Sequence, residues 1–268
     1  MKIANIALVL TLVALPTLAL AADGRSREID RTFPLTADGE VRIDTYKGSV
    51  TVTASASPEV KVHARIELDE SCRDDDRREE KVKQTEVKFQ ATMDRLTIES
   101  DYSQVDDWWG LRNLFEHCSA RPFIHYEVSA PSTVKISIRD HKSRIRISDI
   151  HSDIRIRTHK GKVEVTGLDG AMDLETTKGE ARIVFSKLSR SSRFETHKGE
   201  IELVLPKGAG FKLDADIGRR GSLKSDFAGV ATTGNGHRGE TLAASVNGGG
   251  PALRLSTHKG RFQIKLQT

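Results

Sequence analysis

Residues 154–165 of this chain read Ile-Arg-Ile-Arg-Thr-His-Lys-Gly-Lys-Val-Glu-Val. Apolar and polar side chains alternate before and after the central Thr-His-Lys-Gly, and alternation with a period of two is typical of a strand with one buried face. The Gly interrupts the alternation and predicts a tight turn, where a glycine adopts a positive φ without steric cost. The segment therefore predicts two short strands joined by a turn.

The Thr-His-Lys-Gly motif recurs along the chain. Intact copies begin at Thr158, Thr196 and Thr257, and near copies begin at Thr45 and Thr176. An antiparallel meander would not need one signature at every second turn, whereas a coil that returns to the same edge would. In the C-terminal half, the motif recurs with a period of roughly 20 residues. The residues at the position of its Gly are Ser143, Gly161, Gly179, Gly199, Gly221, Gly239 and Gly260.

These repeats predict an all-β protein, a β-solenoid of about seven laps with roughly 20 residues in each lap. Laps that lie about 4.8 Å apart would make a rod of roughly 34 Å. The register of the alternation predicts that Ile156, Leu174, Phe194 and Leu255 occupy equivalent buried positions.

The first residues predict export. Residues 1–21 combine the basic Lys2, an apolar core at 3–15 and a small-residue cleavage site at 19–21, which is typical of a signal peptide. The apolar run is too short for a convincing membrane span. We therefore expect a secreted protein, periplasmic or associated with the cell surface, with no transmembrane span in the mature chain.

The mature chain is expected to have two parts. Residues 22–130 predict an N-terminal β-rich part, and residues 131–268 predict the repeat solenoid. Two insertions interrupt the strands of the first part. The insertion at 69–83 is dense in charge and is either a mobile loop or an exposed helix, and the insertion at 101–121 predicts a short helix.

Cys72 and Cys118 are the two cysteines of the chain, and each lies in one of these insertions. In an oxidising compartment they predict a disulfide that joins the two insertions. The alternative is a pair of buried free thiols. Two cysteines this far apart give no zinc pattern.

The balance of charge limits the partners. The chain has 42 Lys and Arg against 38 Asp and Glu, and removal of Lys2 leaves 41 − 38 = +3. This excess is too small to indicate global nucleic-acid binding, so we expect no specific nucleic-acid partner.

The His-Lys turns are the sharpest candidate for a binding site. If the laps stack, their basic side chains form a strip along one edge, which could bind an anionic glycan, lipopolysaccharide or extracellular DNA. The alternative is that Lys-Gly is turn chemistry that keeps the edge soluble. The residues of this candidate strip are Lys142, His159, Lys160, Lys178, His197, Lys198, His258 and Lys259.

Catalytic and metal chemistry find little support. We expect Thr177 and either Arg219 or Arg220 to interrupt the column of His, so no metal site is predicted. The recurring Thr before each turn predicts a ladder of hydroxyls that satisfy turn backbone groups. No Ser-His-Asp pattern or paired-carboxylate motif stands out, so we predict no enzyme, no catalytic residue and no cofactor. Fold analogy alone leaves a carbohydrate-active enzyme as an alternative, because parallel β-helices host polysaccharide lyases.

The second insertion offers a different surface. Trp108, Leu111 and Phe115 fall on one face of its expected helix, beside Trp109. That face could bind an envelope protein or a membrane, which would make the chain an envelope sensor or accessory subunit. The alternative is a lid over the open end of the solenoid.

Alternating strands, a Thr-x-Lys-Gly turn in each lap, a signal peptide and the strand 126–131 together resemble the bacterial putative-adhesin domains of unknown function with β-strand repeats, and the related head-GIN auto-transporter-type adhesin domain. The resemblance covers roughly residues 31–268. It implies a location in the cell envelope and supplies no catalytic residues. The chain departs from this pattern at its His-Lys turns, where small polar residues are commoner, and at the insertion 101–121.

Overall fold

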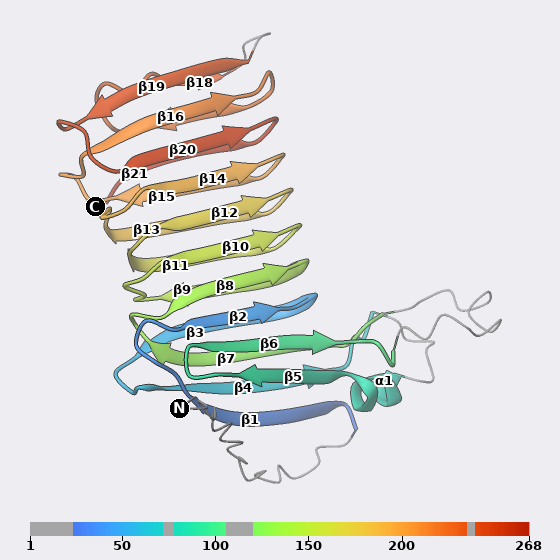
Figure 1. Cartoon of the computed structure of the whole chain (residues 1–268). Helices are drawn as coiled ribbons and strands as arrows, with labels where there is room; N and C mark the ends of the chain where they lie inside the picture. The colour runs from blue at the N-terminus through green and yellow to red at the C-terminus, as the bar shows by residue number, and fades with distance from the viewer. Residues whose placement is uncertain (1–23, 72–77, 106–119, 235–238, 268) are drawn as a thin grey trace, which may run out of the picture.

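Two β-sheets stack face to face around an apolar core and form an elongated coil (Figure 1). This computed structural model describes residues 24–71, 78–105, 120–234 and 239–267. The expected signal peptide, both cysteines and the tryptophan-rich segment lie outside the described residues. The prediction of an all-β fold is confirmed, with sheets that are mostly parallel.

The chain alternates between the two sheets, so that one lap consists of a strand of sheet 2 followed by a strand of sheet 1. Sheet 1 contains, in spatial order, β1 (Ser26–Pro34), β4 (Glu59–Glu67), β7 (Phe123–Pro131), β3 (Lys47–Ser55), β9 (Lys142–Ser148), β11 (Lys162–Asp169), β13 (Glu180–Lys187), β15 (Glu200–Leu205), β21 (Arg261–Leu266), β17 (Ser222–Ser225) and β18 (Thr233–Gly234). Sheet 2 contains β19 (Glu240–Val246), β16 (Phe211–Ile217), β20 (Ala252–Thr257), β14 (Ser192–Thr196), β12 (Met172–Thr176), β10 (Ile154–Thr158), β8 (Lys135–Asp140), β2 (Glu40–Asp44), β6 (Arg95–Asp101) and β5 (Glu86–Ala91).

Parallel neighbours stack in register, as the period-two alternation predicts. Ile156 pairs with Leu174, Leu174 with Phe194, and Phe194 with Leu255. All four side chains are 2% exposed or less, because each points into the space between the sheets. The predicted equivalence of these four core positions is confirmed.

The last lap of the chain is not the last lap of the coil. β20 lies between β14 and β16, and β21 lies between β15 and β17. The expectation that Arg219 or Arg220 separates His197 from His258 is therefore wrong. Gly239 does not open a further parallel lap either, because β19 pairs antiparallel with β16 at the edge of sheet 2.

Both sheets run continuously across residue 130, since β2 pairs with β8 and β3 with β9. Antiparallel strands β1, β4 and β5 close the N-terminal end. The helix α1 (Arg78–Gln84) packs there, and the guanidinium of Arg27 donates to the carbonyl oxygens of Lys83 and Thr85. The first insertion thus contains a helix, one of the two structures expected for it.

Candidate functional site

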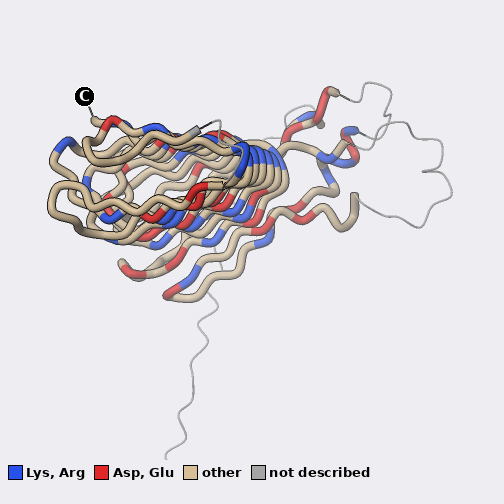
Figure 2. Tube along the Cα trace, turned by 90° about the horizontal axis from the view of Figure 1, so that it is seen from above, with Lys and Arg blue, Asp and Glu red and all other residues tan. Residues whose placement is uncertain are grey.

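The Thr-His-Lys-Gly turns stack in register along one edge of the coil. The backbone N–H of Lys160 donates to the carbonyl oxygen of His141 at 2.9 Å, and that of Lys178 to His159 at 3.0 Å. The same bond joins Lys198 to Thr177 and Lys259 to His197, at 2.9 and 2.8 Å. Equivalent turn residues therefore form columns, with one residue from each lap. Seen down the coil, Lys and Arg segments of successive turns coincide at this edge (Figure 2).

The threonines of the motif hold the turns together. In each of four laps the buried Thr hydroxyl oxygen accepts a hydrogen bond from the backbone N–H of the glycine three residues later, at 2.7–3.0 Å. A buried N–H without a partner would cost about 1–3 kcal/mol, so this bond accounts for the recurrence of Thr. The predicted ladder of hydroxyls is confirmed for four of its five threonines, whereas the Thr45 hydroxyl accepts a hydrogen bond from the Ser100 hydroxyl instead. Its members are Thr158, Thr176, Thr196 and Thr257.

The glycines of these turns are needed for close approach. Gly161, Gly179, Gly199 and Gly260 do not have positive φ, so the expectation of a left-handed backbone is wrong for them. A Cβ at Gly179 would lie nearer than 3.0 Å to the carbonyl oxygen of Gly161, and the same clash recurs between the other glycine neighbours. Gly48, with a φ of 131°, does have the expected conformation.

A column of rings precedes the lysines. The imidazole of His159 stacks on that of His141, with 5.0 Å between centroids, and His141 stacks on the Tyr46 ring at 4.8 Å. The guanidinium of Arg121 covers the other side of the Tyr46 ring at 4.4 Å. His197 and His258 form a separate stacked pair at 5.0 Å, with Thr177 between the two groups.

The lysines form the next column, which we call the lysine column. None of its side chains has a carboxylate within ion-pair distance among the described residues. The turn uses their backbone N–H groups alone, which any residue except proline would supply. Turn chemistry therefore does not explain why these residues are lysines. The column consists of Lys142, Lys160, Lys178, Lys198 and Lys259.

The turn at Lys47 shows the opposite arrangement. Lys47 is the parallel neighbour of Lys142, but its side chain is buried and forms an ion pair with Asp69. Its ammonium also lies 4.4 Å from the centroid of the Phe123 ring. Burial alone would raise the pKa of Asp69, yet the hydrogen bonds from Lys47 and Ser71 hold that pKa below its ordinary value.

Basic side chains on the sheet faces are widely paired. On sheet 2, the guanidinium of Arg155 lies 3.0 Å from Asp173 and that of Arg193 lies 2.8 Å from Glu195. Further ion pairs join Arg157 to Glu175, Arg182 to Glu202, Lys265 to Glu202, Arg261 to Glu200, Lys162 to Glu180 and Arg146 to Glu164.

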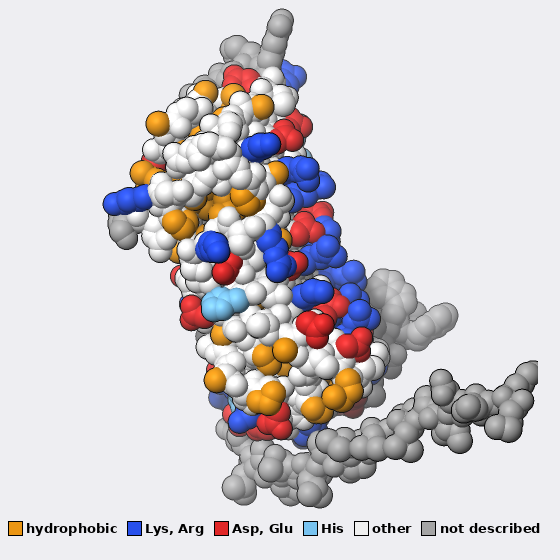
Figure 3. Space-filling view, turned by 60° about the vertical axis from the view of Figure 1, so that its left-hand side comes forward, with side chains coloured by type: hydrophobic (Ala, Val, Ile, Leu, Met, Phe, Trp, Pro, Cys, Tyr) orange, Lys and Arg blue, Asp and Glu red, His pale blue; other side chains and the backbone are white. Residues whose placement is uncertain are grey.

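The edge opposite the lysine column is built from turns of differing sequence. Asp149 has a φ of 58°, and Arg190 forms an ion pair with Asp153 at 2.8 Å. Figure 3 turns this edge toward the viewer, and Lys and Arg side chains there are interspersed with Asp and Glu. An uninterrupted row of one charge sign is thus a feature of the Thr-His-Lys-Gly edge.

Desolvation, the stacked rings and the neighbouring lysines lower the pKa values of His159 and His197. Desolvation, the stacked His141 and the charges of Lys160 and Lys178 lower the pKa of His159. Desolvation, His258 and the neighbouring lysines likewise lower the pKa of His197. These shifts favour the neutral imidazole of His159 and of His197 at pH 7.

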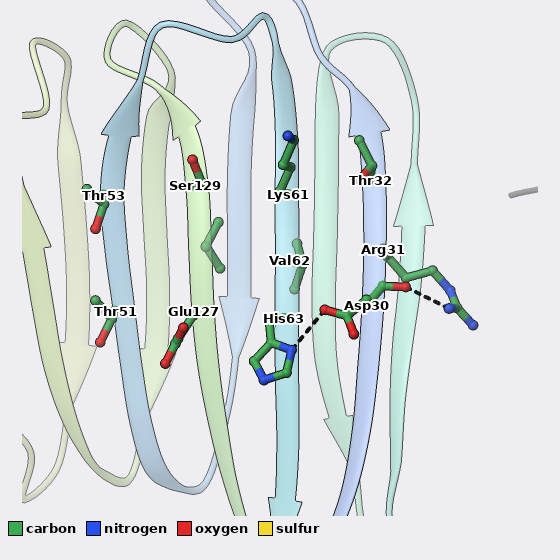
Figure 4. A pocket seen from close by; sticks show the side chains of 11 residues that line it. Asp30, Arg31, Thr32, Thr51, Thr53, Lys61, Val62, His63, Glu127 and Ser129 are labelled. Carbon is green, nitrogen blue, oxygen red and sulfur yellow. Dashed lines mark hydrogen bonds and ion pairs between the residues drawn. The ribbon is translucent and has the colours of Figure 1, made fainter. Parts of the chain in front are cut away.

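A hollow of about 580 Å³ lies away from this edge, on the outer face of sheet 1 (Figure 4). Its side chains come from β1, β3, β4 and β7, and the imidazole of His63 bonds to the Asp30 carboxylate at 2.8 Å. Its charges are of both signs, with Lys61 and Glu127 on neighbouring strands. It therefore lacks the single-sign field that marks the lysine column.

The structure brings all eight residues of the expected strip to one edge. Sequence reasoning left out His141, Tyr46 and Arg121, although the copies of the motif at 45–48 and 140–143 contained the first two. The expected disulfide and the surface of Trp108, Trp109, Leu111 and Phe115 lie outside the described residues and stay predictions.

Two further properties concern the described residues alone. No three His, Cys, Asp or Glu side chains there are placed to hold a metal ion. The helix α1 is short and polar, and the described part of the chain contains no apolar helix long enough to span a bilayer.

Solved structures that are similar to this chain include three proteins named as putative adhesion proteins or adhesins. The first is a putative cell adhesion protein from Clostridium sporogenes, with a TM-score of 0.51, 12% identity and coverage of 91% of this chain and 100% of that one. Putative adhesins from Bacteroides fragilis and Parabacteroides merdae match with TM-scores of 0.35 and 0.28, at 13% and 9% identity, each with coverage of 90% of this chain and 97% of theirs. At these identities the likeness concerns the fold.

No protein of curated function matches the chain. Residues 44–265 match the family described as Toastrack DUF4097, and these residues include every Thr-His-Lys-Gly turn and the strands β3 to β20 of the two sheets. The resemblance to putative-adhesin domains is thereby confirmed. The chain belongs to the Toastrack DUF4097 family.

Proposed function

We propose that this protein is a non-catalytic, adhesin-like binding protein of the cell envelope that holds an anionic polymer along its lysine column. The observation that carries the proposal is the row of stacked lysines, which have no carboxylate partner in the part of the chain that the structure describes. At about 4.8 Å for each lap, five ammonium groups follow one another over roughly 19 Å. A Debye length of about 8 Å at physiological salt means that neighbours in this row repel one another.

A linear polyanion would relieve this repulsion and release its own counterions, which is the main source of affinity in such complexes. The straight course of the column favours an extended ligand that runs along the coil axis. The expected signal peptide and the names of the similar structures support a location in the envelope, where acidic glycans and lipopolysaccharide are the available polyanions.

Binding of fluorescently labelled polygalacturonate tests the proposal. The edge variant changes Lys160, Lys178, Lys198 and Lys259 to Glu, which leaves the turn bonds of Thr and Gly intact. The matched control changes four exposed lysines that lie elsewhere and shifts the net charge equally. Its positions are Lys61, Lys83, Lys187 and Lys212.

We expect the edge variant to lose at least roughly a hundredfold in affinity, and the control to lose far less, because affinity follows the number of local contacts. Equal losses in the two variants would indicate a diffuse charge effect. No binding by the parent protein would overturn the proposal.

A further inference from the structure

A second hollow, of about 320 Å³, lies where the outer face of sheet 2 meets the lysine edge. This volume is at the small end of ligand sites, which span roughly 300–1,000 Å³, and is enough for one saccharide ring. The side chains that matter here are Thr177, Glu195, His197, Asp216, Ser256 and His258.

The hollow exists because small residues interrupt two columns at neighbouring places. In the ring column, Thr177 stands where an imidazole stands in the adjacent laps. In the outward column of sheet 2, Ser256 pairs with Glu195 on one side and with Asp216 on the other. In the lap beyond His258, the turn begins with Gly218, whose backbone lies directly against that of His258.

Among the described residues, the imidazole pair of His197 and His258 therefore has two ring faces without a neighbouring ring. The rings are stacked at 5.0 Å with 9° between their planes, and they are followed by Thr177 on one side and Gly218 on the other. His141 differs, because Tyr46 covers its outer face at 4.8 Å with an interplanar angle of 1°. Both imidazoles line the hollow, and an open ring face is of the kind that stacks with planar or ring-shaped ligands.

The polar groups of the hollow suit hydroxyl groups and oppose anions. An ionised carboxylate only accepts hydrogen bonds, so Glu195 and Asp216 fit ligand O–H donors and repel phosphate or carboxylate groups. Glu195 is held in place by Arg193 at 2.8 Å. Asp216 has no ion-pair partner among the described residues.

Three lysines of the column follow directly on residues that line the hollow. Thr177 precedes Lys178, His197 precedes Lys198, and His258 precedes Lys259. A ligand ring in the hollow would therefore have its acidic substituent within reach of the lysine column. This combination, hydroxyl groups toward carboxylates and an acid toward lysines, is the chemistry of a uronic acid.

We propose that the hollow binds one sugar ring of an acidic polysaccharide, stacked on the His197–His258 pair, while the acid groups of that polymer lie along the lysine column. This inference rests on the proposed function and narrows its ligand from polyanions in general to polyanions that also present hydroxyl groups.

The test compares two labelled polymers, polygalacturonate and inorganic polyphosphate, on the Thr177→His variant. This variant places an imidazole over the open face of His197 and fills the hollow. It is expected to fold, because His occupies that position in the neighbouring laps and the Thr177 side chain takes no part in the turn bonds. The matched control is Thr177→Ser.

We expect Thr177→His to weaken polygalacturonate binding by roughly tenfold, as for the loss of one good contact. Binding of polyphosphate should stay within about twofold of that of the parent protein, since the added imidazole is neutral at pH 7. Thr177→Ser should change neither affinity.

A second variant, Asp216→Asn, should change the affinities for the two polymers in different directions. It should weaken polygalacturonate binding and leave polyphosphate binding unchanged or stronger, because a negative charge is removed. Unchanged polygalacturonate binding in both variants, or an equal loss for both polymers, would overturn the sugar subsite while leaving the lysine column in place. A parent protein that binds neither polymer would overturn the column and the subsite together.

Discussion

The turn at Lys47 and the turns of the lysine column occupy equivalent places on the same edge, yet their ammonium groups have opposite environments. Lys47 is buried, paired with Asp69 and covered by the Phe123 ring. Lys142 and the four lysines that continue its column have no carboxylate partner among the described residues. The comparison shows that a lysine at this position can stabilise the fold through a buried ion pair, as Lys47 does in the N-terminal lap.

Within each turn, some residues hold the turn together and another supplies its charge. The hydroxyl of Thr176 satisfies the N–H of Gly179, and the absence of a Cβ at Gly179 lets the turn approach Gly161. Lys178 contributes only its backbone to this arrangement. Substitutions can therefore separate the structural residues of a turn from its charge.

The largest effect is expected at the glycine. Gly179→Ala places a methyl group against the carbonyl oxygen of Gly161, and the laps must separate to admit it. Overpacking of this kind costs about 3 kcal/mol. Lys178→Ala, one residue away, should change the free energy of unfolding by less than about 0.5 kcal/mol. Chemical denaturation measures both, and equal losses would show that the lysine also belongs to the structure of the turn.

The next effect contrasts the two kinds of lysine directly. Lys47→Gln leaves Asp69 in a partly buried site without its cation and should cost about 2 kcal/mol at pH 7, less than the loss from a fully buried pair. The folded pKa of Asp69 is lowered, so this stabilisation is present above the unfolded pKa of about 3.8 and is lost as the pH falls through the folded value.

The cost of Lys47→Gln should therefore shrink in acid. Lys178→Gln serves as the control, with no measurable loss of stability at either pH. A cost for Lys47→Gln that persists when Asp69 is protonated would assign the loss to packing on Phe123 instead of to the ion pair.

The smallest effect concerns the imidazoles of the edge. The pKa values of His159 and His197 are lowered in the folded protein, so below about pH 6.5 the unfolded chain binds more protons. Stability should consequently fall as the pH drops from 7 toward 5. The groups that face the two rings are His141, His258 and the lysines of the column, with the carboxylates of Glu175, Glu195 and Asp216 along the adjoining hollow.

Replacing His159 and His197 by Gln should flatten this loss, whereas His151→Gln at the opposite edge should not. Saturating polyphosphate should reverse the trend for the parent protein, because protonated imidazoles beside the lysines gain anionic partners. Thermal unfolding across this pH range measures the change, and a parent whose stability is flat from pH 7 to 5 would contradict it.

The period-two pattern predicted most of the fold. It placed Ile156, Leu174 and Phe194 in one buried column. It could not predict the order of the laps, because alternation determines which face of a strand is buried and not which strand lies beside it.

The turns contained a signal for that order. A glycine that touches the carbonyl of the next glycine needs another intact turn as its neighbour, so Gly260 belongs beside Gly199 and the degenerate turn of Gly221 belongs beyond it. The glycines were expected to adopt a positive φ, whereas the structure shows that they allow close approach of neighbouring turns. Because of this error, the glycines were not used to predict the order of the laps. The like-charged neighbours Glu175 and Glu195 are explained by the arginines that pair with each, Arg157 and Arg193.

The sequence predicted the residues of the candidate site but not how they contact one another. The eight strip residues followed from stacking alone. The direct contact of His197 with His258 and the hollow beside them depend on the insertion of the last lap, which brings together residues more than sixty positions apart.

The salt dependence of polyphosphate binding tests the lysine column most directly, because the slope of log affinity against log salt concentration counts the cations that a polyanion neutralises. The magnitude of the slope should fall by roughly 0.7–0.9 for each column lysine changed to Gln, and by roughly 3 for Lys160, Lys178, Lys198 and Lys259 together. Changing Lys61, Lys83, Lys187 and Lys212 to Gln should leave the slope near that of the parent. A slope that falls equally in both variants, or in neither, would contradict the account.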